Sequence, residues 1–346
     1  MQRPVYSKKR IGICGGRDVD QKITGKFCSE LGKKLAESDN YILVSAGYKY
    51  ETEDRCSVDW FTIKGAIDFL NNNEQSDRIQ TSIETILPDH SEKKFQEGNV
   101  IKLHGKSRQA RRFSFVSSVD VLVAIEGNAS TNQNIELACA LNIPVLPVPN
   151  FGGTSLIHWS DKENHRRICE QFKIKKDTGL QPQKPTDEAL TLLAEEVRNY
   201  LVARLKPTCM IIMPFHKDYA PLYDNVIVKA LEKNGFLPIR TDRLNATGDI
   251  IEMIHSGINN CDCAIAVVTE LRPNVMYELG LAHAFQKPVL LLMKKNEEEK
   301  SLPFDIDKLS AIFYDSLDDE LVDKISDTIQ NVQETYLPGR FLAFRE

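Results

Sequence analysis

Short, almost wholly apolar runs alternate with amphipathic segments along most of this chain, and this alternation constrains the fold more than any other feature. Runs such as Tyr41–Ser45 and Cys263–Val268 have the length and composition of strands buried on both faces. The segments between them carry apolar residues at helical spacing, as in Ile23–Glu37, where Phe27 and Leu31 share one face. This pattern predicts an α/β fold, in which parallel sheets are covered by helices on both sides.

The alternation occurs twice, so we expect two parallel-sheet domains joined by a helical linker. Between the two series, Lys173–Lys184 is polar and carries Gly179 and Pro182, and a helix is expected over Asp187–Leu205. That helix either packs on one domain or links the two. The expected domains cover residues 1–172 and 207–346, with the linker and connecting helix over 173–206. The expected strands are Arg10–Cys14, Tyr41–Ser45, Thr81–Leu87, Val119–Ile125 and Ile143–Val148, then Met210–Met213, Leu237–Arg240, Cys263–Val268 and Pro288–Met293.

Composition excludes several classes of protein. A net charge of −5 argues against a general nucleic-acid surface. No run reaches the roughly 18–20 apolar residues of a membrane span, and the N-terminus has no apolar signal core, so a cytoplasmic protein is expected. The 8 cysteines fit neither a disulfide framework nor a zinc ribbon. Cys261 and Cys263 form either a metal or redox pair or two small buried hydrophobes, and the second interpretation is favoured. No metal and no cofactor are expected.

Glu278 stands out in the second series because it follows the strand Cys263–Val268 by one turn of helix. Ligands of open parallel sheets bind at the carboxyl ends of strands, where strand order reverses. The neighbours of Glu278 are apolar, among them Val275 and Leu279. A carboxylate in such a setting needs a function or a partner because its desolvation is costly. It is either a reactive group or an acidic residue that favours the positive end of the helix dipole.

The segment from Met210 to Met293 resembles the nucleoside 2-deoxyribosyltransferase-like family, which is related in fold to TIR domains. The most specific match is the block Pro273-Asn274-Val275-Met276-Tyr277-Glu278-Leu279-Gly280. The resemblance implies a flavodoxin-like domain in which Glu278 attacks the anomeric carbon of a ribose or deoxyribose and displaces the base. It assigns Asp262 and Asn274 to the catalytic set with Glu278, and it assigns substrate binding to Met213, Pro214, Phe215, Arg240, Asp242, Asp249 and Tyr277.

Structural alternatives remain open for several of these residues. Arg240 and Asp242 either hold ribose or phosphate or form a surface ion pair. Asp262 either orients the site or caps the start of the strand that follows it. Asn274 either bonds a sugar hydroxyl or serves the turn after a proline, and Phe215 lies either in the base pocket or in the core.

The N-terminal half resembles the SLOG superfamily, the Rossmann-like group that includes the LOG phosphoribohydrolases and DprA-like proteins. The likeness rests on Ile11–Gly16, Val44–Gly47, Ser107–Arg112 and Asp120–Gly127, in that order. Glycines after a first strand let backbone amides approach a phosphate, and arginines neutralise it; the alternatives are an ordinary tight turn and a solvated helix face. The resemblance places signal-binding residues at Gly15, Gly16, Arg17, Gly47, Arg108, Arg111, Arg112, Gly127, Ser130, Thr131 and Glu136.

The LOG block Gly-Gly-x-Gly-Thr-x-x-Glu is incomplete here, because the stretch Glu126–Glu136 lacks two of the glycines and has a longer Thr-to-Glu spacing. Nucleotide binding without cleavage is therefore the expected role of the N-terminal domain. SLOG domains fused to TIR-like or deoxyribosyltransferase-like domains occur in bacterial anti-phage effectors, where they sense nucleotide signals such as cyclic ADP-ribose derivatives. By this resemblance we expect a ligand-gated, homo-oligomeric N-glycosidase that acts on NAD or a related nucleotide. A housekeeping nucleoside deoxyribosyltransferase and a catalytically silent nucleotide-binding protein are the alternatives.

Overall fold

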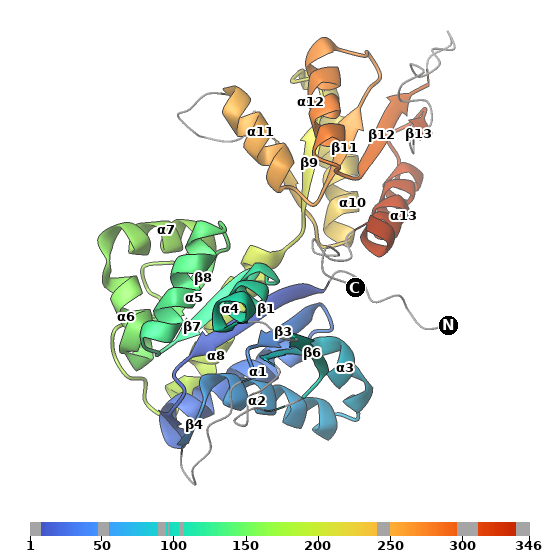
Figure 1. Ribbon diagram of the computed structural model, residues 1–346. Helices are drawn as coiled ribbons and strands as arrows, with labels where there is room; N and C mark the ends of the chain where they lie inside the picture. The colour runs from blue at the N-terminus through green and yellow to red at the C-terminus, as the bar shows by residue number, and fades with distance from the viewer. Residues whose placement is uncertain are drawn as a thin grey trace. The chain divides into compact units, whose positions relative to one another are not determined.

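A computed structural model describes residues 8–47, 55–88, 95, 97–103, 107–240, 250–295 and 311–336. The chain divides into two compact units, one over Lys8–Leu205 and one that includes Lys206–Glu346. In each unit a parallel sheet is covered by helices on both faces (Figure 1). The predicted fold class, two Rossmann-like or flavodoxin-like parallel-sheet domains, is confirmed.

The sheet of the first unit has six parallel strands in the order β6-β5-β3-β1-β7-β8. The chain adds β3, β5 and β6 on one side of β1 and then crosses over to add β7 and β8 on the other side. Strand order therefore reverses between β1 and β7, and the carboxyl ends of these two strands form the topological switch point of this sheet. The strands are β1 (Lys9–Gly15), β3 (Tyr41–Ser45), β5 (Ile83–Pro88), β6 (Asn99–Leu103), β7 (Val121–Ile125) and β8 (Val145–Val148).

Helices cover both faces of this sheet. The larger core lies on the face packed by α1 (Lys26–Ala36), α2 (Val58–Asn72) and α8 (Ala189–Leu205). The opposite face carries α4 (Arg108–Ser117) and α5 (Ala129–Ala140). Because β1 and β3 lie between these layers, residues of α2 and α4 can meet over the carboxyl ends of the strands. Smaller elements are the antiparallel pair β2 (Val19–Asp20) and β4 (Arg55–Cys56), with α3 (Ile79–Ser82), α6 (Gly153–Ser160) and α7 (Lys162–Phe172).

The helix α8 belongs to the first unit. Its buried residues Leu190, Leu193, Val197 and Leu201 lie in the same core as α1 and α2. The polar segment before it is fixed to the unit as well, since Asn150 Nδ2 donates to the carbonyl oxygens of Gly179 (2.9 Å) and Gln183 (3.3 Å).

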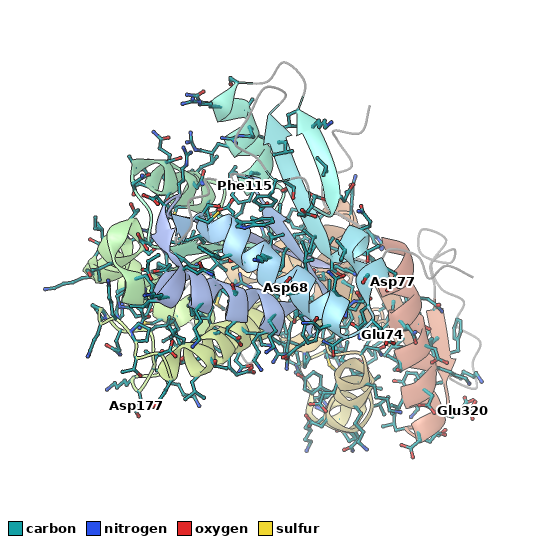
Figure 2. The ribbon with its side chains drawn as sticks, turned by 90° about the horizontal axis from the view of Figure 1, so that it is seen from below. Asp68, Glu74, Asp77, Phe115, Asp177 and Glu320 are labelled. Carbon is teal, nitrogen blue, oxygen red and sulfur yellow. The ribbon has the colours of Figure 1, made fainter. Side chains whose placement is uncertain are left out.

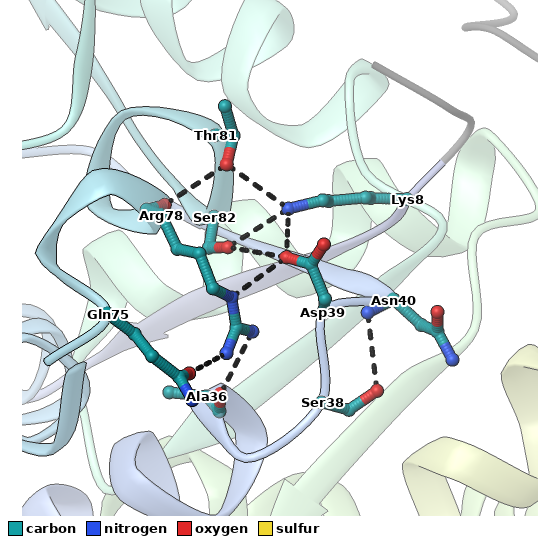
Figure 3. A network of polar contacts seen from close by, with 9 residues as sticks. All are labelled: Lys8, Ala36, Ser38, Asp39, Asn40, Gln75, Arg78, Thr81 and Ser82. Carbon is teal, nitrogen blue, oxygen red and sulfur yellow. Dashed lines mark hydrogen bonds and ion pairs between the residues drawn. The ribbon is translucent and has the colours of Figure 1, made fainter. Parts of the chain in front are cut away.

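A network of polar contacts lies at the amino-terminal edge of the first sheet (Figure 3). Asp39, after α1, accepts hydrogen bonds from Lys8 Nζ (2.6 Å) and Arg78 Nε (2.9 Å), and Lys8 also donates to Ser82 Oγ (3.1 Å). Arg78 Nη2 donates to the carbonyl oxygen of Ala36 (3.1 Å). The network joins the start of β1, the end of α1 and the segment before β5 at the edge opposite the switch point.

The sheet of the second unit has five parallel strands in the order β10-β9-β11-β12-β13, the 2-1-3-4-5 order of flavodoxin-like folds. Its switch point lies between β9 and β11. One face carries α11 (Ile250–Asn260) and α12 (Pro273–Ala284), and the other carries α10 (Val228–Lys233) and α13 (Asp319–Tyr336). The strands are β9 (Thr208–Ile212), β10 (Leu237–Ile239), β11 (Cys263–Val267), β12 (Val289–Lys294) and β13 (Ala311–Tyr314).

In both units apolar side chains are buried against the sheets and most charged side chains are exposed. Phe115, on α4, is 1% exposed within the core between α4 and the first sheet, whereas acidic residues such as Asp68, Asp177 and Glu320 are exposed (Figure 2).

The two edge strands β6 and β13 were not expected from the sequence. Most residues of β6 and part of β13 are accessible to solvent, so these two strands lack the continuous apolar run that marks the central strands.

Candidate functional site

The switch point of the first sheet begins with two glycines at the end of β1. Gly16 N donates to the carbonyl oxygen of Ile125 (3.1 Å), and the carbonyl oxygen of Gly16 accepts from Val58 N at the start of α2 (2.9 Å). A Cβ atom on Gly15 would lie 2.1 Å from Ile125 O, so no side chain fits there. The ends of β1, β7 and α2 are thus drawn together at one point.

The turn after β7 is held in an unusual backbone conformation. Glu126 has φ 57° and Gly127 has φ 95°, both in the left-handed region. The start of α6 fixes this turn, since Thr154 N donates to Gly127 O (3.1 Å) and Ser155 Oγ donates to Glu126 O (2.9 Å). Thr131, 2% exposed, donates its hydroxyl to Gly15 O (3.1 Å) and so ties α5 to β1. Hydrogen bonds from α5 and α6 therefore fix the backbone that forms the floor of the switch point.

Four arginines gather beside this floor, and we call Arg17, Arg108, Arg111 and Arg112 the arginine cluster. Arg17 Nη2 and Arg112 Nη2 both donate to Ser130 Oγ, at 3.1 and 3.4 Å. Arg112 Nε also donates to Asn134 Oδ1 (3.0 Å). Burial and the neighbouring charges of Arg17, Arg112 and Arg108 lower the pKa of Arg111, although Asp59 opposes this. Like charges gathered at the start of α5 form the electrostatic setting of an anion site.

Asp59, the second residue of α2, is the one buried acidic side chain that faces this cluster among the residues that the structure describes. It is 6% exposed, and its Oδ2 accepts from Ala46 N at 3.3 Å. Burial raises the pKa of Asp59 to about 6, against the opposing effects of the Ala46 amide and of the charges on Arg17 and Arg111. The sequence interpretation missed this residue; its signal is a carboxylate two residues after the helix cap Ser57, between the apolar residues Val58 and Trp60.

The structure brings together most residues predicted for this site. Gly47 follows β3, the strand beside β1, and has φ 65°; its N–H donates to Ser45 Oγ (3.2 Å). Glu136 is the exception, because it is exposed and accepts from Asn132 Nδ2 (2.6 Å). Asn134, bonded to Arg112, lies two residues earlier, about 200° away around the helix at 3.6 residues per turn. Glu136 therefore lies away from the hydrogen bonds of Arg112, and its part in the signal site stays a prediction. The residues that meet there are Gly15, Gly16, Arg17, Arg108, Arg111, Arg112, Gly127, Ser130 and Thr131.

The second unit presents a different set of groups at its switch point. Met213 and Pro214, after β9, are buried, and Phe215 is 51% exposed. Arg240, after β10, is only 8% exposed, and its guanidinium lies 4.6 Å from the ring centre of Tyr223 and 5.9 Å from that of Phe215. These distances are within the range of cation–π contacts. A largely desolvated cation with aromatic neighbours therefore lies at the carboxyl edge of β9 and β10.

Glu278 lies on the buried face of α12. It is 4% exposed and shares this face with Val275, Leu279 and Ala282, which pack against the sheet. The spacing of these residues follows the helical repeat, so Glu278 lies on the side of α12 that faces the sheet. Gly280, in contrast, is exposed and a Cβ there would meet nothing within 4 Å. Gly280 is therefore not needed for close contact between helix and sheet, whereas Ala282 is fully buried against the sheet.

Two tyrosines lie at the outer side of this switch point. Tyr277 is 51% exposed, and its hydroxyl lies 3.0 Å from His255 Nε2 on α11. Tyr219 donates to Glu270 Oε1 (2.9 Å), which joins the loop after β9 to the loop before α12. Asn274 is exposed in the first turn of α12, where it can reach solvent or a ligand. Asp242 and Asp249 lie outside the described residues.

Asp262 is found at the opposite edge of the second sheet. Its Oδ2 accepts from Thr208 N at 2.8 Å, and its own N–H donates to Thr208 O at 2.9 Å. These bonds fix the amino ends of β9 and β11, whereas α12 begins at their carboxyl ends. Of the two interpretations of Asp262, the structure favours the strand cap over the catalytic role.

Among the described residues, no group of three or more His, Cys, Asp or Glu side chains could hold a metal ion. Cys261 and Cys263 are buried, and burial is the main cause that raises the pKa of Cys261 to about 12. None of the described helices is long and apolar enough to span a bilayer.

Comparison with known proteins gives no family assignment. No protein family profile matches the chain, and no curated protein sequence matches it. One similar solved structure is a structural genomics target named TM1055, with 22% identity and a TM-score of 0.36 over 56% of this chain and 98% of that one. The Moco carrier protein from Chlamydomonas reinhardtii has 20% identity and a TM-score of 0.34 over 57% and 99%. The CMP N-glycosidase BcmB from Clostridium botulinum has 18% identity and a TM-score of 0.26 over 34% and 97%. At these identities and TM-scores, the likeness carries no functional conclusion.

Proposed function

We propose that this protein is an N-glycosidase whose reactive carboxylate is Glu278 and whose N-terminal unit binds a nucleotide-derived signal. The observation that carries the proposal is the burial of Glu278 at 4% exposure, on a helix that starts at the switch point of the second sheet. Buried carboxylates are costly, and they concentrate at functional sites. The sequence block around Glu278, which resembles that of the deoxyribosyltransferase-like family, supports the same role.

The proposed reaction uses Glu278 as a nucleophile. One carboxylate oxygen attacks the anomeric carbon of a ribose, the bond to the base nitrogen breaks, and its electron pair leaves with the base. The positive charge that develops on the sugar is stabilised by the adjacent carboxylate. Water then cleaves the glycosyl ester and restores Glu278. Arg240, beside Tyr223 and Phe215, suits the phosphate of a nucleotide substrate.

The N-terminal unit has the features of a binding site rather than of a second catalytic centre. The arginine cluster provides positive charge, and Ser130 provides a hydroxyl, beside the tightly packed turn of Gly15 and Gly16. In this proposal the ligand favours an active arrangement, most simply a homo-oligomer, which requires tighter binding to that arrangement than to the inactive one. The substrate is NAD or a related nucleotide. A role in anti-phage defence stays a prediction from the resemblance.

The test is the release of free base by the purified full-length chain, followed by liquid chromatography. The substrates are NAD, ATP, dATP and deoxynucleosides, each with and without ADP-ribose and cyclic ADP-ribose. Wild type should release nicotinamide or a nucleobase, and Glu278→Gln should be inactive. Glu252→Gln, the same substitution at an exposed position of α11, should keep wild-type activity.

Each outcome has a distinct meaning. Base exchange between free deoxynucleosides without any ligand would support a housekeeping deoxyribosyltransferase. Equal activity in Glu278→Gln would reject the assignment of the nucleophile. No release from any substrate with any ligand would reject the enzyme and leave a nucleotide-binding protein.

A further inference from the structure

Asp59 is not explained by the anion site that surrounds it. A phosphate site gains nothing from a carboxylate, because two negative groups repel each other. Asp59 is nevertheless 94% buried, and it lies close enough to Arg17 and Arg111 for their charges to act on it. It is held there by the N–H of Ala46, which immediately follows β3. The position of this carboxylate is therefore part of the fold rather than a chance surface contact.

The geometry shows where Asp59 lies relative to the arginine cluster. Asp59 comes from α2, on the face of the sheet packed by α1, whereas Arg111 and Arg112 come from α4, on the other face. The bond between Gly16 O and Val58 N places the start of α2 directly at the end of β1. The carboxylate and the guanidinium groups therefore approach the same strand ends from opposite sides of the sheet.

The carboxylate keeps the capacity for another hydrogen bond. An ionised carboxylate offers about four acceptor positions on two oxygens. Among the described residues, its hydrogen-bond donors are backbone N–H groups, that of Ala46 at 3.3 Å and that of Asp59 itself. The arginine groups act on it through charge. A ligand that brought a hydroxyl donor to this position would complete its hydrogen bonding.

We propose that Asp59 accepts a hydrogen bond from a sugar hydroxyl of the ligand whose phosphate is held by the arginine cluster, so that this site selects a ribose phosphate over a plain anion. The inference rests on the proposed binding function of the N-terminal unit and names the chemical class of its ligand. A sugar next to a phosphate supplies both groups that the site requires, a donor for Asp59 and an anion for Arg17, Arg111 and Arg112. Hydrogen bonds from hydroxyls to charged groups are among the stronger ones in proteins.

The ionisation of Asp59 adds a pH dependence to this selection. Burial raises its pKa to about 6, while Arg17 and Arg111 favour the charged form. The thiols that feel its charge, Cys14 on β1 and Cys28 on α1, are buried with strongly raised pKa values and stay neutral. Asp59 is therefore ionised at pH 7.5 and mostly protonated at pH 5. Because a carboxylate accepts hydrogen bonds better than a carboxylic acid, preference for the sugar should rise between these two pH values.

The experiment is isothermal titration of the full-length chain with two probes, ADP-ribose and sulfate, neither of which titrates in this pH range. For wild type we expect ADP-ribose to bind far more tightly than sulfate at pH 7.5, with a smaller preference at pH 5. Asp59→Asn, which keeps the shape of the side chain, should weaken ADP-ribose binding about tenfold or more, the loss of one charged hydrogen bond. It should leave sulfate binding unchanged or tighter, because a negative charge is removed.

A second measurement does not depend on the folding of the variant. Wild type is titrated with an ADP-ribose analogue in which hydrogen replaces the 2′- and 3′-hydroxyls of both riboses. This ligand keeps the diphosphate and should bind about tenfold more weakly than ADP-ribose. Retention of full affinity for it would overturn the proposal.

The remaining outcomes separate the inference from the function on which it rests. If Asp59→Asn tightens the binding of both probes alike, Asp59 is only a counter-charge for the arginines and the inference is wrong. If the variant binds ADP-ribose as wild type does, the inference is also wrong. If wild type binds neither probe, the proposed nucleotide-binding function itself fails.

Discussion

Replacing Arg112 by glutamine rather than by lysine should leave the protein slightly more stable in the absence of anions, and it should weaken the response of the protein to anions. Arg112 belongs to the arginine cluster, and its Nη2 shares Ser130 Oγ with Nη2 of Arg17. An arrangement that holds like charges together is strained until an anion binds. Removal of one charge should relieve that strain, whereas the same removal should cost binding.

The magnitude follows from the shared hydrogen-bond acceptor. The two bonds are 3.1 and 3.4 Å long, so the two Nη2 atoms are at most about 6.5 Å apart. Two unit charges at that distance repel by about 0.6 kcal/mol in water and by about 2.5 kcal/mol at an effective dielectric constant of 20. Arg17 is exposed and Arg112 is half-buried, so solvent screening favours the lower figure. A gain of about 0.6 kcal/mol corresponds to roughly 1–3 °C in Tm for a domain of this size.

Thermal unfolding of Arg112→Gln and Arg112→Lys provides the assay. Both variants lose the guanidinium bonds to Ser130 and Asn134, but only the glutamine removes the charge. At about 20 mM NaCl the glutamine variant should melt higher than the lysine variant, and the difference should vanish near 1 M NaCl, where the Debye length is about 3 Å. Sulfate at matched ionic strength should raise the Tm of wild type more than that of the glutamine variant.

The reasoning is refuted if the two variants melt at the same temperature at low salt, since the charges would then not repel each other measurably. Equal stabilisation of wild type and Arg112→Gln by sulfate would show that Arg112 takes no part in an anion site.

Three further predictions follow from contacts in the first unit. Thr131→Val, which removes the hydroxyl bonded to Gly15 O, should lower the free energy of unfolding by about 1–3 kcal/mol in urea titrations, whereas Thr131→Ser should lower it less; equal losses would contradict this. Gly127→Ala should be more destabilising than Gly152→Ala, because both glycines have positive φ but only at Gly127 would the new Cβ meet an atom, Thr131 Oγ1 at 2.4 Å; similar melting temperatures would show that the contact relaxes. Although burial opposes it, the bonds and charges of Lys8 and Arg78 lower the pKa of Asp39, so its stabilisation is complete above the unfolded-state pKa of about 4 and is lost as pH falls through the lower folded value. Asp39→Asn should therefore cost less than about 1 kcal/mol at pH 7, since the side chain is 62% exposed, and nothing near pH 2; a cost that persists at pH 2 would rule out this linkage.

The sequence was sufficient where one local pattern decides the structure. The apolar run Tyr41–Ser45 forms β3 with the predicted bounds. A central strand is covered by helices on both faces of the sheet, so nearly all of its residues are apolar and buried. The burial of Glu278 was predictable from its apolar neighbours at helical spacing. The edge strand β6 was not, because Asn99, Ile101 and Lys102 face solvent and its pairing with β5 comes from tertiary contacts.

Features that depend on distant residues could not be read from the sequence. Asp59 gains its role from Ala46, 13 residues away, and from Arg111, on the opposite face of the sheet. The order of residues in the LOG block predicts Glu136 as a signal-binding residue. In the structure it is Asn134, two residues earlier on α5, that accepts a hydrogen bond from Arg112. The resemblance places Asp262 in the catalytic set, but a residue that precedes a parallel strand lies at the edge of the sheet opposite the carboxyl-end site.

The measurement that tests the central claim most directly is peptide mass spectrometry of the protein quenched during turnover of the substrate identified by base release. If Glu278 is the nucleophile, the peptide that contains it should carry the mass of one glycosyl group in wild type, and this adduct should be absent from Glu278→Gln, which should also release no base. Undiminished base release by Glu278→Gln, or a glycosyl adduct on another carboxylate, would contradict the account.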